Sequence, residues 1–119
     1  MELFTQYDYG KLLQNGKPEN QDKVHKPVVK IFTPDANCTW LFSEIVHLDT
    51  AFGLCDLGFG FPELGYVYLP ELVALRGRLG LPVERDLHFK AYYSIIVYAR
   101  AASHYNRIIE DESILAQFA

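Results

Sequence analysis

Four short runs rich in β-branched and aromatic residues follow one another in the middle of the chain, each closed by a turn signal. The runs cover residues 28–32, 39–46, 51–57 and 64–69. Runs of this kind, separated by Pro, Gly, Asp and Asn, predict β-strands. Because the connections are short, they favour an antiparallel meander. Residues 83–89 form a fifth extended segment, which we expect at an edge of the sheet.

The predicted turns between these runs carry polar and aromatic side chains. Residues 34–37 read Pro-Asp-Ala-Asn, and this composition is typical of a β-turn whose side chains bond their own backbone. Residues 58–62 read Gly-Phe-Gly-Phe-Pro. We expect Phe59 and Phe61 of this second turn to cap the core.

Three segments outside the strands show helical spacing. Residues 3–14 predict a short helix that stops at Asn15-Gly16. A second helix is expected to begin at Pro70, to bury Leu72, Leu75 and Leu79, and to end at Gly80 and Pro82. Residues 91–109 predict the longest helix. The fold class is therefore α+β, with an antiparallel sheet of about four to five strands packed against an N-terminal, a short middle and a longer C-terminal helix.

The composition indicates one ordinary globular domain. The chain has 119 residues, half of them hydrophobic, so it can form a core without metal or disulfide. Two cysteines, Cys38 and Cys55, are too few for a disulfide framework. The residues contain no zinc motif, so we expect no metal and no cofactor. The N-terminus lacks a signal peptide pattern, and no apolar run is long enough for a membrane span, which predicts a cytoplasmic protein without membrane contact.

Charge is unevenly distributed. The net charge is −4, which argues against a general nucleic-acid binder. All the arginines nevertheless lie in the C-terminal half, where they could pair with carboxylates or phosphates. They are Arg76, Arg78, Arg85, Arg100 and Arg107. A solvated helix face is the more ordinary interpretation of this distribution.

The densest group of titratable residues lies in the fifth extended segment. In an extended strand, Glu84, Asp86 and His88 share one face, with Arg85 on the other. Two carboxylates and an imidazole could bind a divalent metal or form an acid–base set. The alternative, which we favour, is a charged strand edge that prevents pairing with other chains.

Two further groups are candidate binding residues. Asp35, Asn37 and Trp40 could form a polar rim with an aromatic platform, or simply a turn followed by a core tryptophan. Asp56 and Glu63 flank the glycine turn and could join Glu84 in an acidic pocket. Arg76 and Arg85 complete the candidate binding residues, as cations that could pair with these carboxylates or with a ligand.

Three segments carry a family resemblance. They read VVKIFTPDANCTW at residues 28–40, FPELGYV at 61–67 and RGRLGLPVERDLHF at 76–89. These segments resemble a bacterial family known as domain of unknown function 2958. The similarity covers about residues 10–90 of a single domain spanning 1–119, with a C-terminal helical extension over 91–119. Members often have Ser before the short helix, where this chain has Leu69 and Pro70, so a side-chain cap is expected to be lost.

The resemblance implies a setting and leaves the chemistry open. Such proteins are typical of bacterial plasmids and other mobile DNA, and no catalytic residue set comes with the family. We therefore expect a non-enzymatic accessory protein of a mobile genetic element that binds another protein. The alternatives are a small metal-dependent hydrolase centred on Glu84, Asp86 and His88 and, with less support, a nucleic-acid binder that uses the arginines.

Overall fold

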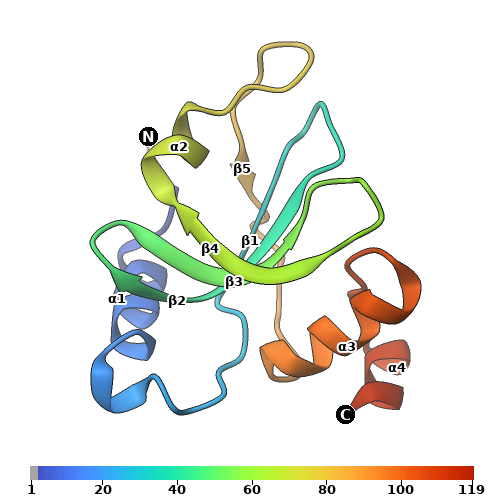
Figure 1. The fold of residues 1–119 in the computed structure, drawn as a ribbon. Helices are drawn as coiled ribbons and strands as arrows, with labels where there is room; N and C mark the ends of the chain where they lie inside the picture. The colour runs from blue at the N-terminus through green and yellow to red at the C-terminus, as the bar shows by residue number, and fades with distance from the viewer. Residues whose placement is uncertain (1–2) are drawn as a thin grey trace.

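The protein forms one antiparallel sheet with helices on both of its faces (Figure 1). The computed structural model describes residues 3–119. Its strands are β1 (Val29–Phe32), β2 (Thr39–His47), β3 (Thr50–Asp56), β4 (Glu63–Tyr68) and β5 (Glu84–Arg85). Their order in the sheet is β4-β3-β2-β1-β5, and every neighbouring pair is antiparallel. The predicted α+β fold is confirmed.

Helices α1 (Gln6–Asn15) and α2 (Leu69–Ala74) cover one face of the sheet. Thr5 caps α1, because its Oγ1 accepts a hydrogen bond of 3.0 Å from the Asp8 N–H. The hydrophobic cluster on this face is centred on strand residues and receives apolar side chains from both helices. Its members include Leu12, Val29, Ile31, Trp40, Phe42, Ile45, Leu69 and Leu72.

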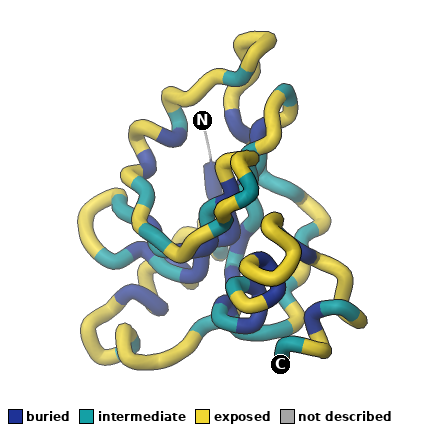
Figure 2. The backbone as a smooth tube through the Cα atoms, turned by 45° about the vertical axis from the view of Figure 1, so that its right-hand side comes forward, coloured by how far each residue is buried: buried dark blue, intermediate teal, exposed yellow. Residues whose placement is uncertain are grey.

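Helices α3 (Ile95–Tyr105) and α4 (Glu112–Leu115) cover the opposite face. Leu41 of β2 and Leu54 of β3 point to this side, because alternate residues of a strand face opposite ways. They pack against a buried stripe on the helices that comprises Ile95, Tyr98, Ala101, Ala102 and Leu115. Figure 2 shows burial concentrated where the helices meet the sheet, while the outer loops are exposed.

Short 3-10 turns complete the chain. They are η1 (Pro18–Asn20) and η2 (Ala116–Phe118). Within residues 3–119, no helix has both the length and the apolar character that a bilayer crossing requires.

Two of the predicted helices are shorter in the structure than the sequence indicates. The middle helix ends at Ala74, since Leu75 adopts an extended conformation. Leu75 and Leu79 are therefore exposed, and the prediction that they belong to a buried stripe is wrong. The C-terminal helix begins at Ile95 and ends at Tyr105, and the next residue, Asn106, adopts the left-handed conformation. Helix α2 also lacks a side-chain cap, as expected from Leu69 and Pro70.

The glycine turn differs most from expectation. Phe59 and Phe61 were expected to cap the core, but their exposed fractions are 78% and 79%. Gly58 and Gly60 on either side of Phe59 both have positive φ angles, of 84° and 85°. This conformation, which glycine adopts without strain, leaves the phenylalanine rings on the surface of the loop.

Candidate functional site

The predicted set of Glu84, Asp86 and His88 does not lie along one extended strand. Strand β5 ends at Arg85, and the chain turns at Asp86. The Asp86 carboxylate accepts a hydrogen bond of 2.8 Å from the His88 N–H and pairs with Lys30 at 3.3 Å. The backbone hydrogen bond from His88, reinforced by Lys30, lowers the pKa of Asp86. Glu84 and His88 are exposed. Among residues 3–119, no three His, Cys, Asp or Glu side chains are arranged to hold a metal ion.

Lys30 connects strand β1 with the C-terminal segment. Its Nζ lies 2.7 Å from Glu110 and 3.3 Å from Asp86. Partial burial opposes the charge, but hydrogen bonds and attraction from these two carboxylates outweigh it and raise the pKa of Lys30. Asp86 thus forms an ion pair with a residue that is distant in the sequence, and we assign it a structural role.

Asp35 binds the loop that follows helix α2. Its Oδ2 accepts hydrogen bonds from the Leu79 and Leu81 N–H groups, at 2.7 and 3.2 Å. Gly77 lies so close that a Cβ there would meet the Asp35 carboxylate at 1.7 Å. Asp35 therefore organises residues 77–81 through local bonds.

Of the two alternatives for Asp35, Asn37 and Trp40, the polar rim with an aromatic platform is not the one that the structure favours. Trp40 is only 4% exposed and lies in the cluster beneath α1 and α2. Asn37 is exposed in the turn, packed against Gly58 of the next loop. The turn and core interpretation fits these three residues.

Asp56 is buried and fully engaged with backbone. Its Oδ1 accepts a hydrogen bond of 2.9 Å from the Gly58 N–H, and its Oδ2 accepts one of 3.2 Å from the Ile108 N–H. The hypothesis of a shared acidic pocket with Glu63 and Glu84 is wrong. Glu63 lies in β4 and Glu84 in β5, at opposite edges of the sheet. Four strand spacings of about 4.8 Å separate the two edges by roughly 19 Å.

Three of the five arginines bind carbonyl oxygens of their own chain. The Arg76 guanidinium donates to the Val73 and Leu75 carbonyls at the end of α2. Arg85 donates to the Leu3 carbonyl at 3.0 Å, and Arg100 donates to the Phe118 carbonyl at 3.1 Å. These bonds connect loops and termini to the body of the protein, so these three arginines serve the fold.

The two cysteines are free thiols on the same face of the sheet. Cys55 of β3 lies opposite Trp40, two residues along β2 from Cys38. Burial, with a smaller contribution from the negative charge of Glu63, raises the pKa of Cys55 to about 11. Burial also raises the pKa of Cys38. Neither thiol has the lowered pKa of a nucleophile.

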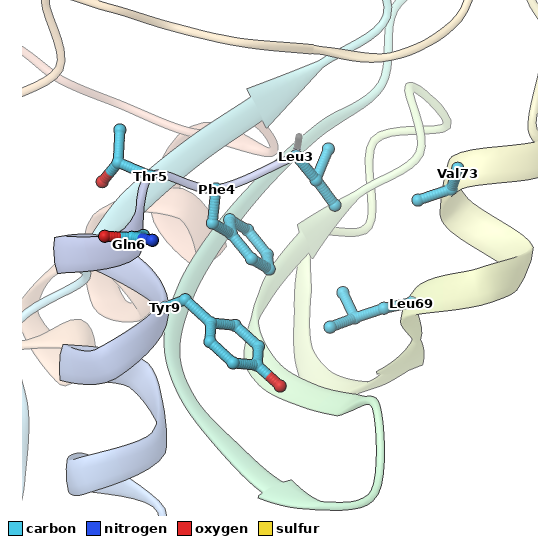
Figure 3. Close-up of a pocket in the computed structure, with 7 residues that line it drawn as sticks. All are labelled: Leu3, Phe4, Thr5, Gln6, Tyr9, Leu69 and Val73. Atoms are coloured by element: carbon cyan, nitrogen blue, oxygen red, sulfur yellow. The ribbon is translucent and has the colours of Figure 1, made fainter. Parts of the chain in front are cut away.

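An apolar pocket of about 280 Å³ lies between the N-terminal segment, α1 and α2. Figure 3 shows the rings of Phe4 and Tyr9 pointing toward Leu69 of α2. The rest of the lining comprises Leu3, Thr5, Gln6 and Val73. None of these described lining residues is a carboxylate, an imidazole, a thiol or a cation, so the pocket offers little of the polar anchoring that orients a substrate.

The most unusual surface lies at one edge of the sheet, along β4 and the loop that precedes it. We call it the aromatic edge, and it comprises Leu57, Phe59, Phe61, Leu64, Tyr66 and Tyr68. At about 200 Å² for a fully exposed aromatic side chain, its four rings alone present roughly 550 Å² of surface. The largest apolar patch on a monomer typically covers about 300–600 Å², and such a patch is often functional.

The aromatic edge is hollowed at the start of β4. A concavity of about 330 Å³ lies there, with an apolar lining of loop and strand side chains. Its lining includes Cys55, Leu57, Phe59, Phe61 and Leu64. Tyr66, further along β4, packs on Phe52 of β3 with ring centroids 5.0 Å apart. The surface thus combines exposed rings with a hollow between them.

The chain segment that carries the aromatic edge is acidic. Between residues 31 and 75 the chain has six carboxylates and no Lys or Arg. Glu63 at the start of β4 and Glu71 in the first turn of α2 are both exposed, and neither forms an ion pair within residues 3–119. The aromatic edge therefore has an exposed carboxylate that forms no ion pair within residues 3–119 near each end of β4.

Sequence reasoning missed this surface because it assigned the two phenylalanines to the core. A signal was present: both phenylalanines stand in a predicted turn, Phe59 between two glycines and Phe61 between glycine and proline. Only Glu63 of the predicted binding residues lines the hollow of the aromatic edge.

Fold and surface together define a small α+β protein whose distinctive feature is an exposed aromatic sheet edge. The family model of a protein of unknown function, DUF2958, matches residues 3–109. The chain belongs to this family. The match extends beyond residues 10–90 and takes in helix α3. Comparison with curated proteins and with solved structures gives no match.

Proposed function

We propose that the protein is a non-enzymatic accessory protein that acts by binding another protein through the aromatic edge. We propose further that it serves a bacterial mobile genetic element, the setting that the resemblance implies. The observation that supports binding is the set of exposed rings, with Phe59, Phe61 and Tyr66 at 78%, 79% and 67% exposure. Aromatic side chains are enriched among the residues that contribute most to protein interfaces.

The roles of the polar candidates agree with this proposal. Asp35, Asp56 and Asp86 accept hydrogen bonds from backbone N–H groups of their own chain. A carboxylate engaged in this way has less capacity for acid–base work than one aimed into a cleft. The aromatic edge, in contrast, has no role in the core.

Site-specific photo-crosslinking tests the proposal. Phe59 or Phe61 is replaced by p-benzoylphenylalanine, and the protein is illuminated in its native host. The matched control places the same group at Tyr7, which is equally exposed but lies on α1. We expect a light-dependent adduct with a second protein from positions 59 and 61, and none from position 7.

Competition distinguishes a specific adduct from accidental contact. Excess unlabelled protein should suppress the adduct, whereas excess of a Phe59→Ser, Phe61→Ser double variant should not. Adducts that are equal at all three positions, or absent from all, would contradict the proposal.

A further inference from the structure

We propose that the partner is an extended segment of another protein, with basic residues at both ends, which adds as a strand to the outer edge of β4. This inference rests on the proposed function and states which kind of chain the aromatic edge binds. In strand addition, main-chain hydrogen bonds supply affinity and alternate side chains supply specificity.

The backbone of β4 has free hydrogen-bonding groups on its outer side. Pairs in an antiparallel ladder alternate between hydrogen-bonded and non-bonded. The Leu69 N–H donates to the Asp49 carbonyl at 2.7 Å just beyond β4, and this bond sets the alternation. Gly65 and Val67 therefore turn their peptide groups toward β3. Leu64 and Tyr66 turn theirs outward, where no residue between 3 and 119 pairs with them.

The β4 edge has little of the usual protection against strand pairing, since its one charged residue, Glu63, stands at its first position. Natural edges are blunted by shortness, charge, proline or bulges. The opposite edge follows this rule, since β5 has two residues, Glu84 and Arg85, and then turns. β4 has six residues, contains no proline or lysine, and pairs with β3 without a register shift.

Side chains along β4 are arranged to contact an added strand. Leu64, Tyr66 and Tyr68 share one face of the sheet, because they occupy alternate positions. Apolar residues at alternate positions of the incoming segment would lie beside them. The hollow near Phe59 and Phe61 lies beside the first residues of β4. It therefore receives a side chain from one terminus of the added segment.

Charge identifies the partner as basic. Glu63 and Glu71 stand near the two ends of β4, and neither forms an ion pair within residues 3–119. A partner with Lys or Arg at both ends complements them.

A second copy of this chain does not complement these carboxylates. Antiparallel pairing of two copies about Tyr66 would bring Glu63 of one copy toward the α2 turn of the other, which carries Glu71.

Two synthetic peptides test the inference. One has the sequence Lys-Val-Thr-Val-Thr-Val-Lys, and its matched control replaces both lysines by glutamate. Seven extended residues span about 20 Å, close to the length of β4. Binding to the ¹⁵N-labelled protein is followed by NMR. We expect the lysine peptide to shift the amide signals of Leu64 and Tyr66, and to bind at least tenfold more tightly than the glutamate peptide at low salt.

A pair of variants isolates the main-chain bonds. Tyr66→Pro removes the outward N–H but leaves the bonds to β3, a position that proline tolerates in edge strands. Tyr66→Thr keeps the N–H and removes the ring. We expect Tyr66→Pro to bind the lysine peptide at least tenfold more weakly than Tyr66→Thr. Thermal unfolding of both variants verifies that they are folded, and Leu64→Pro replaces Tyr66→Pro if that variant does not fold.

Three outcomes would overturn the inference: equal binding of the two peptides, no binding of either, or a dimer of the free protein in sedimentation that Tyr66→Pro dissociates. If the peptides fail while Phe59 still crosslinks a partner, strand addition is wrong and the proposed function stands. If the lysine peptide binds but no crosslink forms, the β4 edge can add a strand, and the proposed accessory role in the host is wrong.

Discussion

At the scale of single residues, most polar side chains that stood out in the sequence serve the backbone. Asp35, Asp56 and Asp86 each accept N–H groups from loops that follow a strand or helix. Carboxylates suit this task because hydrogen bonds to a charged acceptor are stronger than those between neutral groups. The same residue types would be chosen for catalysis, so their identity alone does not separate the two roles.

The raised pKa of Cys55 gives a prediction at this scale. With a pKa of about 11 and not the ordinary 9, the folded protein should have roughly a hundredfold less thiolate at pH 8. We expect iodoacetamide to alkylate Cys55 slowly, about tenfold faster with each pH unit up to pH 11, as measured by mass spectrometry. Protein unfolded in urea serves as the control. Equal rates in the folded and unfolded protein at pH 8 would show that the thiol is not shielded.

The same shift has a consequence for stability. The folded state holds the Cys55 proton more tightly than the unfolded state, so its contribution to stability is complete below about pH 9. That contribution is lost as the pH rises through about 11. Glu63→Gln, which removes the nearby negative charge, should lower the pKa and raise the alkylation rate at a given pH.

At the scale of elements, the strands followed from the sequence more closely than the helices. Residues of β1 to β4 alternate or run apolar between turn signals, and the burial of β2 and β3 between helices on both faces agrees with this pattern. The middle helix was predicted too long because Leu72, Leu75 and Leu79 have helical spacing. Spacing does not reveal that Asp35, more than 40 residues earlier, bonds Leu79 and Leu81 and holds that stretch as a loop.

The loop at residues 77–81 gives the prediction at this scale. Asp35→Ala removes a charged acceptor from two backbone N–H groups, and we expect it to lower the free energy of unfolding by about 2–3 kcal/mol. Urea denaturation measures the loss, and faster hydrogen exchange at the Leu79 and Leu81 amides locates it. Pro34→Ala, in the same turn but outside this network, is the control. An unchanged exchange rate at both amides in Asp35→Ala would refute the assignment.

At the scale of the whole molecule, the C-terminal third is fixed to the sheet by polar ties as well as by its core. Asp56 bonds the Ile108 N–H ahead of α4, and Lys30 pairs with Glu110. These two contacts hold the segment between α3 and α4 against the strands. The sequence predicted that a C-terminal helix would pack on the sheet, but it gave no indication of these partners, because they are 52 and 80 residues apart.

Removing the hydrogen bonds of the Asp56 carboxylate should lower the stability of the whole fold. We expect Asp56→Ala to lower the free energy of unfolding by about 2–4 kcal/mol, since two N–H groups lose a charged acceptor. Asp56→Asn, which keeps one carbonyl oxygen, should lose less. Urea denaturation with NMR hydrogen exchange at Ile108 measures both effects. A change below about 0.5 kcal/mol in Asp56→Ala would be ordinary for a surface site and would contradict the anchoring role.

The exposed rings of Phe59 and Phe61 also bear on the fate of the free protein in a cell. Chaperones and proteases recognise apolar surface of this kind, because it resembles the surface of unfolded chains. A bound partner would shield it. We therefore expect co-expression of the proposed partner to lengthen the lifetime of the protein, and copies made in excess of that partner to be degraded.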